Sequence, residues 1–410
     1  MNNISASKVK QFHRSLVVMA LLAALPVGAQ TTAAETIRPE IGKPLRAAQD
    51  LMKAGRFKEA LAKVKEADAV ANHTRYEDFI LDRMRGSAAT VAGDDELAAK
   101  SFESVLNSDR LQSSERLPIL EALASAAYKA KDYSRAIDWV QRYFKEGGTS
   151  EQMGNLQASA HYLSGDYAGV VHDMQTRVHA VESSVPVVDE TTLRMLAASY
   201  AKLGDAAGYL ETIEKLLVHH PKKEYWADVL ARIQAKPNFS DRLELDLYRL
   251  RLATDTLESA DQYVEMAQLS LQAGLPAEAK RIVDAGYAAG KLGTGPEAER
   301  HQRLRDLAVK QAAEDDKALL VEVVGRNADS LATTGQALVS VGQLDKGIDL
   351  IERGVAKGGL KHPIETRLHL GEAYLTAGQK AKAIETFRTV SGPDGLDDMS
   401  KLWVILAARS

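Results

Sequence analysis

The sequence of 410 residues contains no cysteine, and its absence excludes disulfide bonds, thiolate metal sites and a cysteine-linked lipid anchor. After residue 30 no stretch approaches 18 uninterrupted apolar residues, so we expect no transmembrane helix in that part of the chain. Neither charge sign is in large excess, since the net charge is −4. Basic and acidic residues are interspersed, as on solvated helix faces, and this pattern argues against a nucleic-acid partner.

The first 29 residues have the features of a secretory signal peptide. Lys8, Lys10 and Arg14 precede an apolar stretch at 16–27, and Val27-Gly28-Ala29 has the small-x-small form that signal peptidase recognises. The apolar stretch spans about 18 Å as a helix, whereas a bilayer core is about 30 Å thick. We therefore predict cleavage after Ala29, no stable membrane insertion, a net charge that changes from −4 to −7, and a periplasmic location in a Gram-negative host.

A turn signal recurs along the chain, formed by glycine followed by x-aromatic or by aspartate and a small residue. The turns begin at Gly55, Gly93, Lys131, Gly165, Gly204, Gly274, Gly342 and Gly378. Neighbouring turns are 34 to 39 residues apart, except for two intervals of 70 and 68 residues. Each long interval predicts one degenerate unit, at 224–257 with a turn at Pro237-Asn238, and at 295–330 with a turn near 314–316.

The same apolar pattern surrounds each turn. Small and large apolar residues precede the turn at helical spacing, and a second series that starts at an alanine follows it, as at Ala383, Phe387 and Val390. A glycine at the turn ends the first helix in a left-handed conformation, and the small residues let two helices approach closely. The pattern predicts an all-α chain of antiparallel helix pairs.

These residues resemble the tetratricopeptide repeat (TPR) family, most closely at 364–397, where Leu370, Gly371, Tyr374, Gly378 and Phe387 fall at the family's positions. The resemblance implies a TPR-like α-solenoid, a right-handed superhelix of helix pairs with a concave groove. We expect a linker at 30–44, about ten helix pairs at 45–392, and a C-terminal capping helix within 393–410 that buries Trp403.

The sequence offers no catalytic, cofactor or metal site. It lacks the nucleophile-elbow, zinc-protease and phosphate-loop motifs, and the loop at 290–295 is not preceded by a strand. His362 and His369 lie two helical turns apart, about 10 Å, which is too far for two ligands of one ion. We expect the adjacent His219 and His220 to cap the carbonyl groups at the end of their helix. A non-enzymatic role is therefore predicted.

In the TPR family the first helix of each pair lines the concave groove, so its exposed residues are the ones that a partner touches. This implies a partner-binding set of polar and aromatic residues, suited to an extended peptide. The set comprises Arg83, Ser87, Glu121, Tyr128, Asn155, Ser159, Tyr162, Arg194 and Lys202.

The N-terminal unit, from Ile37 to Leu45 and on into the turn at Gly55, resembles exported proteobacterial TPR proteins that accompany the TonB, ExbB and ExbD energy-transduction system. The resemblance implies a periplasmic adaptor that contacts this complex and supports uptake across the outer membrane. The alternatives are a TPR scaffold of another envelope machine, for polysaccharide export, outer-membrane assembly or peptidoglycan, and a hydrolase built on helical repeats.

Overall fold

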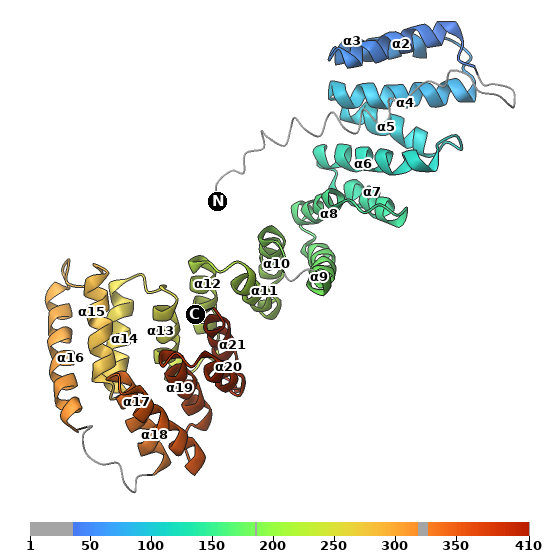
Figure 1. Ribbon diagram of the computed structural model, residues 1–410. Coiled ribbons are helices and arrows are strands. Elements are labelled where there is room, and N and C mark those ends of the chain that lie inside the picture. Colours follow the sequence, from blue (N-terminus) through green and yellow to red (C-terminus); the bar gives the residue numbers. More distant parts are fainter. Residues whose placement is uncertain (1–35, 185–186, 319–326, 410) are drawn as a thin grey trace. The chain divides into compact units, whose positions relative to one another are not determined.

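The computed structural model describes residues 36–184, 187–318 and 327–409. Within these ranges the chain forms twenty α-helices, one 3₁₀-helix and no strand (Figure 1). No helix in the described ranges is long and apolar enough to cross a membrane. The predicted signal peptide at 1–29 lies outside the described residues. The all-α prediction is confirmed, and consecutive helices pair in the antiparallel manner of TPR units.

The chain divides into two compact units. Unit 1 holds the described residues up to 184 together with 198–204, and unit 2 holds 187–197 and 205 onward, so that α10 (Glu190–Leu203) contributes to both. The helices of unit 1 that precede α10 are α2 (Pro39–Lys53), α3 (Phe57–Asp68), α4 (Arg75–Ala92), α5 (Asp95–Leu106), α6 (Ser113–Lys129), α7 (Tyr133–Lys145), α8 (Glu151–Ser164) and α9 (Tyr167–Ser184).

Unit 2 continues the pattern of helix pairs to the C-terminal end of the described chain. Its helices after α10 are α11 (Ala206–His219), α12 (Lys223–Gln234), η1 (Asp241–Leu243), α13 (Glu244–Ala253), α14 (Ala260–Gln272), α15 (Pro276–Ala288), α16 (Ala298–Ala318), α17 (Ala328–Ser340), α18 (Leu344–Lys357), α19 (Pro363–Thr376), α20 (Lys380–Arg388) and α21 (Leu396–Ala407).

The recurring turn combines a helix stop with a helix start. At Gly93 the chain takes φ 83°, a left-handed conformation that glycine adopts at little cost, and α4 ends there. The next residue, Asp94, accepts a hydrogen bond from the Leu97 backbone N–H at 3.2 Å and so caps α5. Asp132 and Asp205 cap α7 and α11 in the same way. The sequence Gly-Asp therefore closes one helix and opens its partner.

Small residues set the distance between the helices of a pair. An alanine in the first turn of the second helix is fully buried at Ala60, Ala136 and Ala383. In the pair formed by α19 and α20, a Cβ atom added to Gly371 would lie 2.5 Å from the Phe387 ring, because the ring packs directly on the glycine backbone. Large side chains of the second helix thus fill the space that small residues of the first leave open.

Two boundaries differ from the sequence predictions. Residues 39–44 are not a linker but the first part of α2, in which Ile41 and Leu45 are buried. The turn predicted near 314–316 is absent, because α16 continues to Ala318. An acidic run ended the predicted helix there, yet acids are compatible with a helix interior, and only glycine and proline break one strongly.

The C-terminal repeats of unit 2 fold back onto its first helices. Lys236, after α12, forms an ion pair with Asp398 of α21 at 2.6 Å, and Ser240 donates its backbone N–H to the Asp394 carbonyl at 3.1 Å. The Arg409 guanidinium donates to the Leu217 carbonyl at 3.2 Å. Trp403 of α21 is 5 % exposed and stacks on Phe387. Helix α21 is therefore held by both ends of the unit.

Lys131 occupies the turn position at which other repeats have glycine, with φ 62°. A side chain in this conformation costs roughly 1–2 kcal/mol, partly offset by the greater freedom of glycine in the unfolded chain.

We expect Lys131→Gly to raise the free energy of unfolding of unit 1 by about 0.5–1 kcal/mol. Urea unfolding followed by the fluorine resonance of 5-fluorotryptophan at Trp139, which is resolved from those of Trp226 and Trp403, measures this change in the free energy of unfolding. Lys100→Gly, in the exposed interior of α5, is the control and should lower the value by about 1 kcal/mol; equal losses in both variants would contradict the explanation.

Gly347 stands where most repeats have alanine, and the structure explains why. A Cβ atom at this position would lie 2.7 Å from the Gly335 carbonyl oxygen, so the backbones of α17 and α18 are in direct contact. We expect Gly347→Ala to lower the free energy of unfolding of unit 2 by about 3 kcal/mol, because neither backbone can yield cheaply.

Gly154→Ala in α8 is the matched control, since the nearest atom would be 3.6 Å from the new Cβ. Glycine disfavours a helix interior by up to about 1 kcal/mol relative to alanine, so this variant should gain stability. Denaturation curves that show no loss for Gly347→Ala would mean that the two helices can separate freely.

Candidate functional site

The predicted partner-binding residues all lie on the first helices of successive pairs. Arg83 and Ser87 are on α4, Glu121 and Tyr128 on α6, Asn155, Ser159 and Tyr162 on α8, and Arg194 and Lys202 on α10. Contacts connect the first three of these helices. Arg83 pairs with Glu115 of α6 at 2.5 Å, and Tyr128 is hydrogen-bonded to Ser159 of α8. In unit 1, α4, α6 and α8 thus form one continuous face.

Individual members of the set differ in their availability to a partner. Asn155 is exposed and accepts a hydrogen bond from Arg177 at 2.8 Å, and Arg194 and Lys202 are also exposed. Ser87 is 3 % exposed, so it is a core residue and not a groove residue. The sequence pattern could not distinguish these cases because serine is compatible with both environments. Glu121 is half-buried and is hydrogen-bonded to Tyr143.

The two predicted tyrosines serve their own repeats as well as the surface. Tyr128 and Tyr162, near the ends of α6 and α8, pack edge-to-face on Tyr133 and Tyr167 at the starts of α7 and α9, with ring centroids 5.7 and 5.4 Å apart. Both predicted residues are half-buried. Burial raises the pKa of Tyr128. Each tyrosine packs against the turn of its own repeat and is still partly exposed to solvent.

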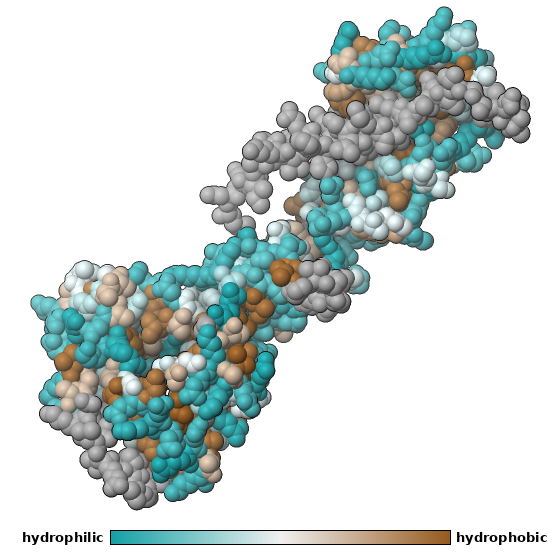
Figure 2. Space-filling view, in the orientation of Figure 1, coloured by the Kyte–Doolittle hydropathy of each residue, from teal (hydrophilic) through white to brown (hydrophobic). Residues whose placement is uncertain are grey.

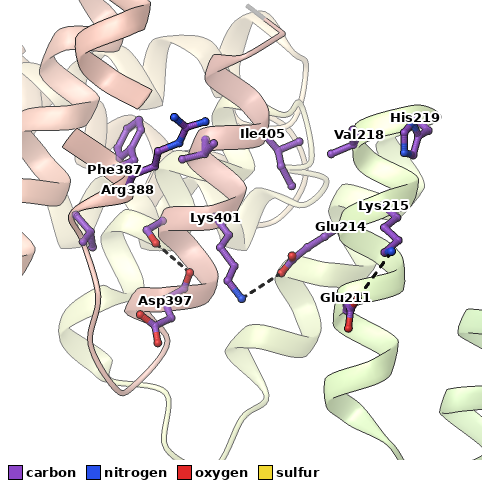
Figure 3. Close-up of a pocket in the computed structure, with 13 residues that line it drawn as sticks. Glu211, Glu214, Lys215, Val218, His219, Phe387, Arg388, Asp397, Lys401 and Ile405 are labelled. Atoms are coloured by element: carbon purple, nitrogen blue, oxygen red, sulfur yellow. Dashed lines mark hydrogen bonds and ion pairs between the residues drawn. The ribbon is translucent and has the colours of Figure 1, made fainter. Parts of the chain in front are cut away.

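Unit 2 carries an amphipathic groove of about 510 Å³ between α11 and the helices α20 and α21 (Figure 3). Its walls include Val218, Phe387 and Ile405, and Lys401 reaches toward Glu214 at 4.0 Å. Burial raises the pKa of Glu214. Elsewhere polar side chains cover most of the visible surface, with apolar ones in small patches (Figure 2). The repeat pattern did not predict this groove because it depends on the fold-back of α21.

A cluster of buried charged residues lies between α13, α15 and α19 of unit 2. Arg249 is its centre, and its guanidinium contacts Asp246 at 2.6 Å, Glu278 at 2.8 Å and Glu372 at 3.4 Å. The Nε2 atom of His369 donates to the Asp246 carboxylate at 2.9 Å. The side chains of the three acids and Arg249 are each less than 15 % exposed. Sequence analysis missed this cluster because its members are up to 126 positions apart.

Burial and neighbouring charges shift the pKa values of the side chains in the cluster. Burial raises the pKa of Glu372 to about 8. The Asp246 carboxylate raises the pKa of His369 against the effect of burial. His369 and Arg249 lower the pKa of Asp246, and Arg249 lowers the pKa of Glu278, in both cases against burial. The cluster therefore holds a carboxyl group, that of Glu372, that is protonated near neutral pH.

Two further histidines have side-chain contacts that the sequence did not predict. The His220 side chain does not cap its own helix, because its Nε2 contacts the Val188 carbonyl at 2.6 Å and ties the end of α11 to the segment before α10. His362 is hydrogen-bonded to Arg242 at 3.0 Å. Both histidines therefore join segments distant in sequence, a role that local spacing cannot reveal.

The geometry of paired helices, left-handed turns and stacked first helices defines a TPR-like helical-repeat protein. Residues 45–115, which span α3 to α5 and parts of α2 and α6, match the family model described as tetratricopeptide repeat. A comparison with curated proteins found no match.

The solved structures to which this chain is similar include TPR proteins. One is a tetratricopeptide repeat protein from Parabacteroides merdae, with 12 % identity over 82 % of this chain and 99 % of that chain and a TM-score of 0.33. Another is the C-terminal part of a TPR repeat-containing protein from Cytophaga hutchinsonii, with 15 % identity over 78 % and 98 % and a TM-score of 0.29. A third is the complex of the TPR2AB domain of yeast Sti1 with pHSP90, with 13 % identity over 72 % and 100 % and a TM-score of 0.25.

The cluster predicts that unit 2 loses stability as the pH rises. The raised pKa of Glu372 means that the folded state binds more protons than the unfolded state between the usual value near 4.5 and about 8, so the free energy of unfolding falls across this range. His369 acts in the same direction, because its raised pKa favours the folded state below that pKa. We expect the free energy of unfolding to fall by about 3 kcal/mol between pH 5.5 and 8.5.

Glu372→Gln removes the titrating carboxyl group. The free energy of unfolding of this variant should keep only the smaller pH dependence that is due to His369. Urea unfolding in a Trp139→Phe background measures it, since Trp226 and Trp403 then report on unit 2. Glu385→Gln on the exposed surface of α20 is the control and should keep the wild-type slope. Parallel profiles for the wild type and Glu372→Gln would contradict this role of Glu372.

Proposed function

We propose that this chain is an exported, non-catalytic scaffold that binds extended segments of protein partners on the face formed by α4, α6 and α8. The observation that carries the proposal is the continuity of this face. Ion pairs and hydrogen bonds join neighbouring first helices, and half-buried tyrosines alternate with polar groups along it. Such a surface supplies hydrogen-bond partners for a peptide backbone and aromatic surface for its side chains.

The proposed location is the periplasm, and the proposed partners are components of the TonB, ExbB and ExbD complex. The location rests on the signal-like segment at 1–29, and the partners rest on the resemblance of the N-terminal unit to exported TPR proteins that accompany this system. In this role the protein supports energy transduction to receptors in the outer membrane. It positions its partners and transforms no substrate.

Site-specific photo-crosslinking in cells tests both parts of the proposal. A photoreactive phenylalanine analogue at Asn155 lies on the proposed face, and the same analogue at Lys100 of α5 lies on an exposed second helix. We expect Asn155 to crosslink a component of the transducer complex with at least about fivefold higher yield than Lys100, because specific binding energy is concentrated at the centre of an interface.

The outcomes separate the scaffold from its partner. Crosslinks from Asn155 to proteins of polysaccharide export, outer-membrane assembly or peptidoglycan synthesis would retain the scaffold and replace the TonB assignment. Equal or absent crosslinking at both positions would overturn the use of this face.

A further inference from the structure

Unit 2 contains a second cavity, of about 310 Å³, beside the buried charged cluster. Its walls combine apolar and polar residues and come from six helices and the residue that precedes one of them. The apolar lining consists of Ala253, Leu275, Val339, Ile351, Ala373, Leu375 and Trp403. Arg249, Glu278, His369 and Glu372 of the cluster also line it, together with Arg281, Gln336, Ser340 and Thr376. The cavity thus joins an apolar chamber to a charged wall.

The charged wall contains more carboxyl groups than its cations pair with. Arg249 faces three acids, and it binds Glu278 through two hydrogen bonds of 2.9 and 2.8 Å and Asp246 through one of 2.6 Å. Glu372 is the most distant of the three, at 3.4 Å, and shares the same guanidinium nitrogen with Asp246. Arg249 therefore leaves Glu372 poorly compensated.

The other cations near the cavity are also engaged elsewhere. His369 contacts Asp246 through one ring nitrogen and Gln336 through the other. Arg281 is exposed and donates to the Ser340 carbonyl. As a result the Oε1 atom of Glu372 is buried and has no hydrogen-bond partner. A buried carboxylate oxygen without a partner costs free energy, and a ligand that donates to it recovers that cost.

Resting on the proposed function, we propose that this cavity receives a lysine side chain of the protein partner, with its ammonium group donating to Glu372. The apolar walls match the four methylene groups of lysine, whose stem packs on apolar surface while its head keeps a polar contact. Trp403 adds an aromatic surface beside the cation. The unpartnered Nε1–H of Trp403 is a donor for the backbone carbonyl that accompanies a lysine in a peptide.

Binding of an ammonium group must be coupled to ionisation of Glu372. The free protein carries this carboxyl protonated at neutral pH, since its pKa is about 8, whereas the ion pair requires the carboxylate. One proton therefore leaves the protein for each ligand bound below pH 8. By linkage the affinity for the lysine side chain rises about tenfold between pH 6 and pH 7 and levels off above about pH 8.

A ligand titration of the full chain tests the site. The probe is N-acetyl-lysine methylamide, and binding is read from the fluorine resonance of 5-fluorotryptophan at Trp403. We expect saturable binding, a pH dependence as above, and at least tenfold weaker binding by N-acetyl-norleucine methylamide, which has the same stem without the charge. Cadaverine, a free diamine, should bind at least threefold more weakly than the lysine probe; equal or tighter binding would assign the cavity to small amines and overturn the peptide assignment.

Glu372→Gln preserves the shape of the side chain and should weaken lysine binding at least tenfold and remove its pH dependence. Glu385→Gln should leave both unchanged. Unaltered binding by Glu372→Gln, or equal binding of the norleucine probe, would overturn the proposal. Crosslinking at Asn155 in unit 1 is read independently, so loss of lysine binding with retained crosslinks would refute this site and leave the scaffold function in place.

Discussion

The close approach of two helices within each pair is the constraint on which the rest of the structure depends. Where the first helix carries glycine, as at Gly371, the ring of a large residue from the second helix packs on its backbone. Where both helices carry glycine, as at Gly335 and Gly347, the backbones themselves touch. The size of one residue therefore fixes the geometry of a pair, and a stack of such pairs fixes which faces meet solvent.

This local control explains what the sequence could predict. The apolar spacing and the Gly-Asp turns are local signals, and they identified the helical pairs and the first helices on which Tyr128 and Asn155 lie. These signals could not predict the structure where neighbouring residues are compatible with more than one environment. The linker predicted at 30–44 extends too far, because α2 already includes Pro39 and Pro44, and Ser87 is equally compatible with core and groove.

The features of unit 2 that bear on function were beyond the reach of any local pattern. Asp246, Glu278 and Glu372 are ordinary surface acids by composition, and only the return of α19 to α13 brings them around Arg249. The groove lined by Val218 and Ile405 depends on the same return. Long-range closure creates these sites, whereas the repeat creates the framework that carries them.

The contacts of α21 with the beginning of unit 2 have a consequence for how the unit folds. In an open stack of repeats each pair meets only its neighbours, so terminal pairs can fray and refold independently. Here Arg409 and Leu217 are tied across 192 positions of sequence. Closing that loop costs entropy, so we expect the unit to behave as one cooperative block that folds more slowly than an open array of equal length.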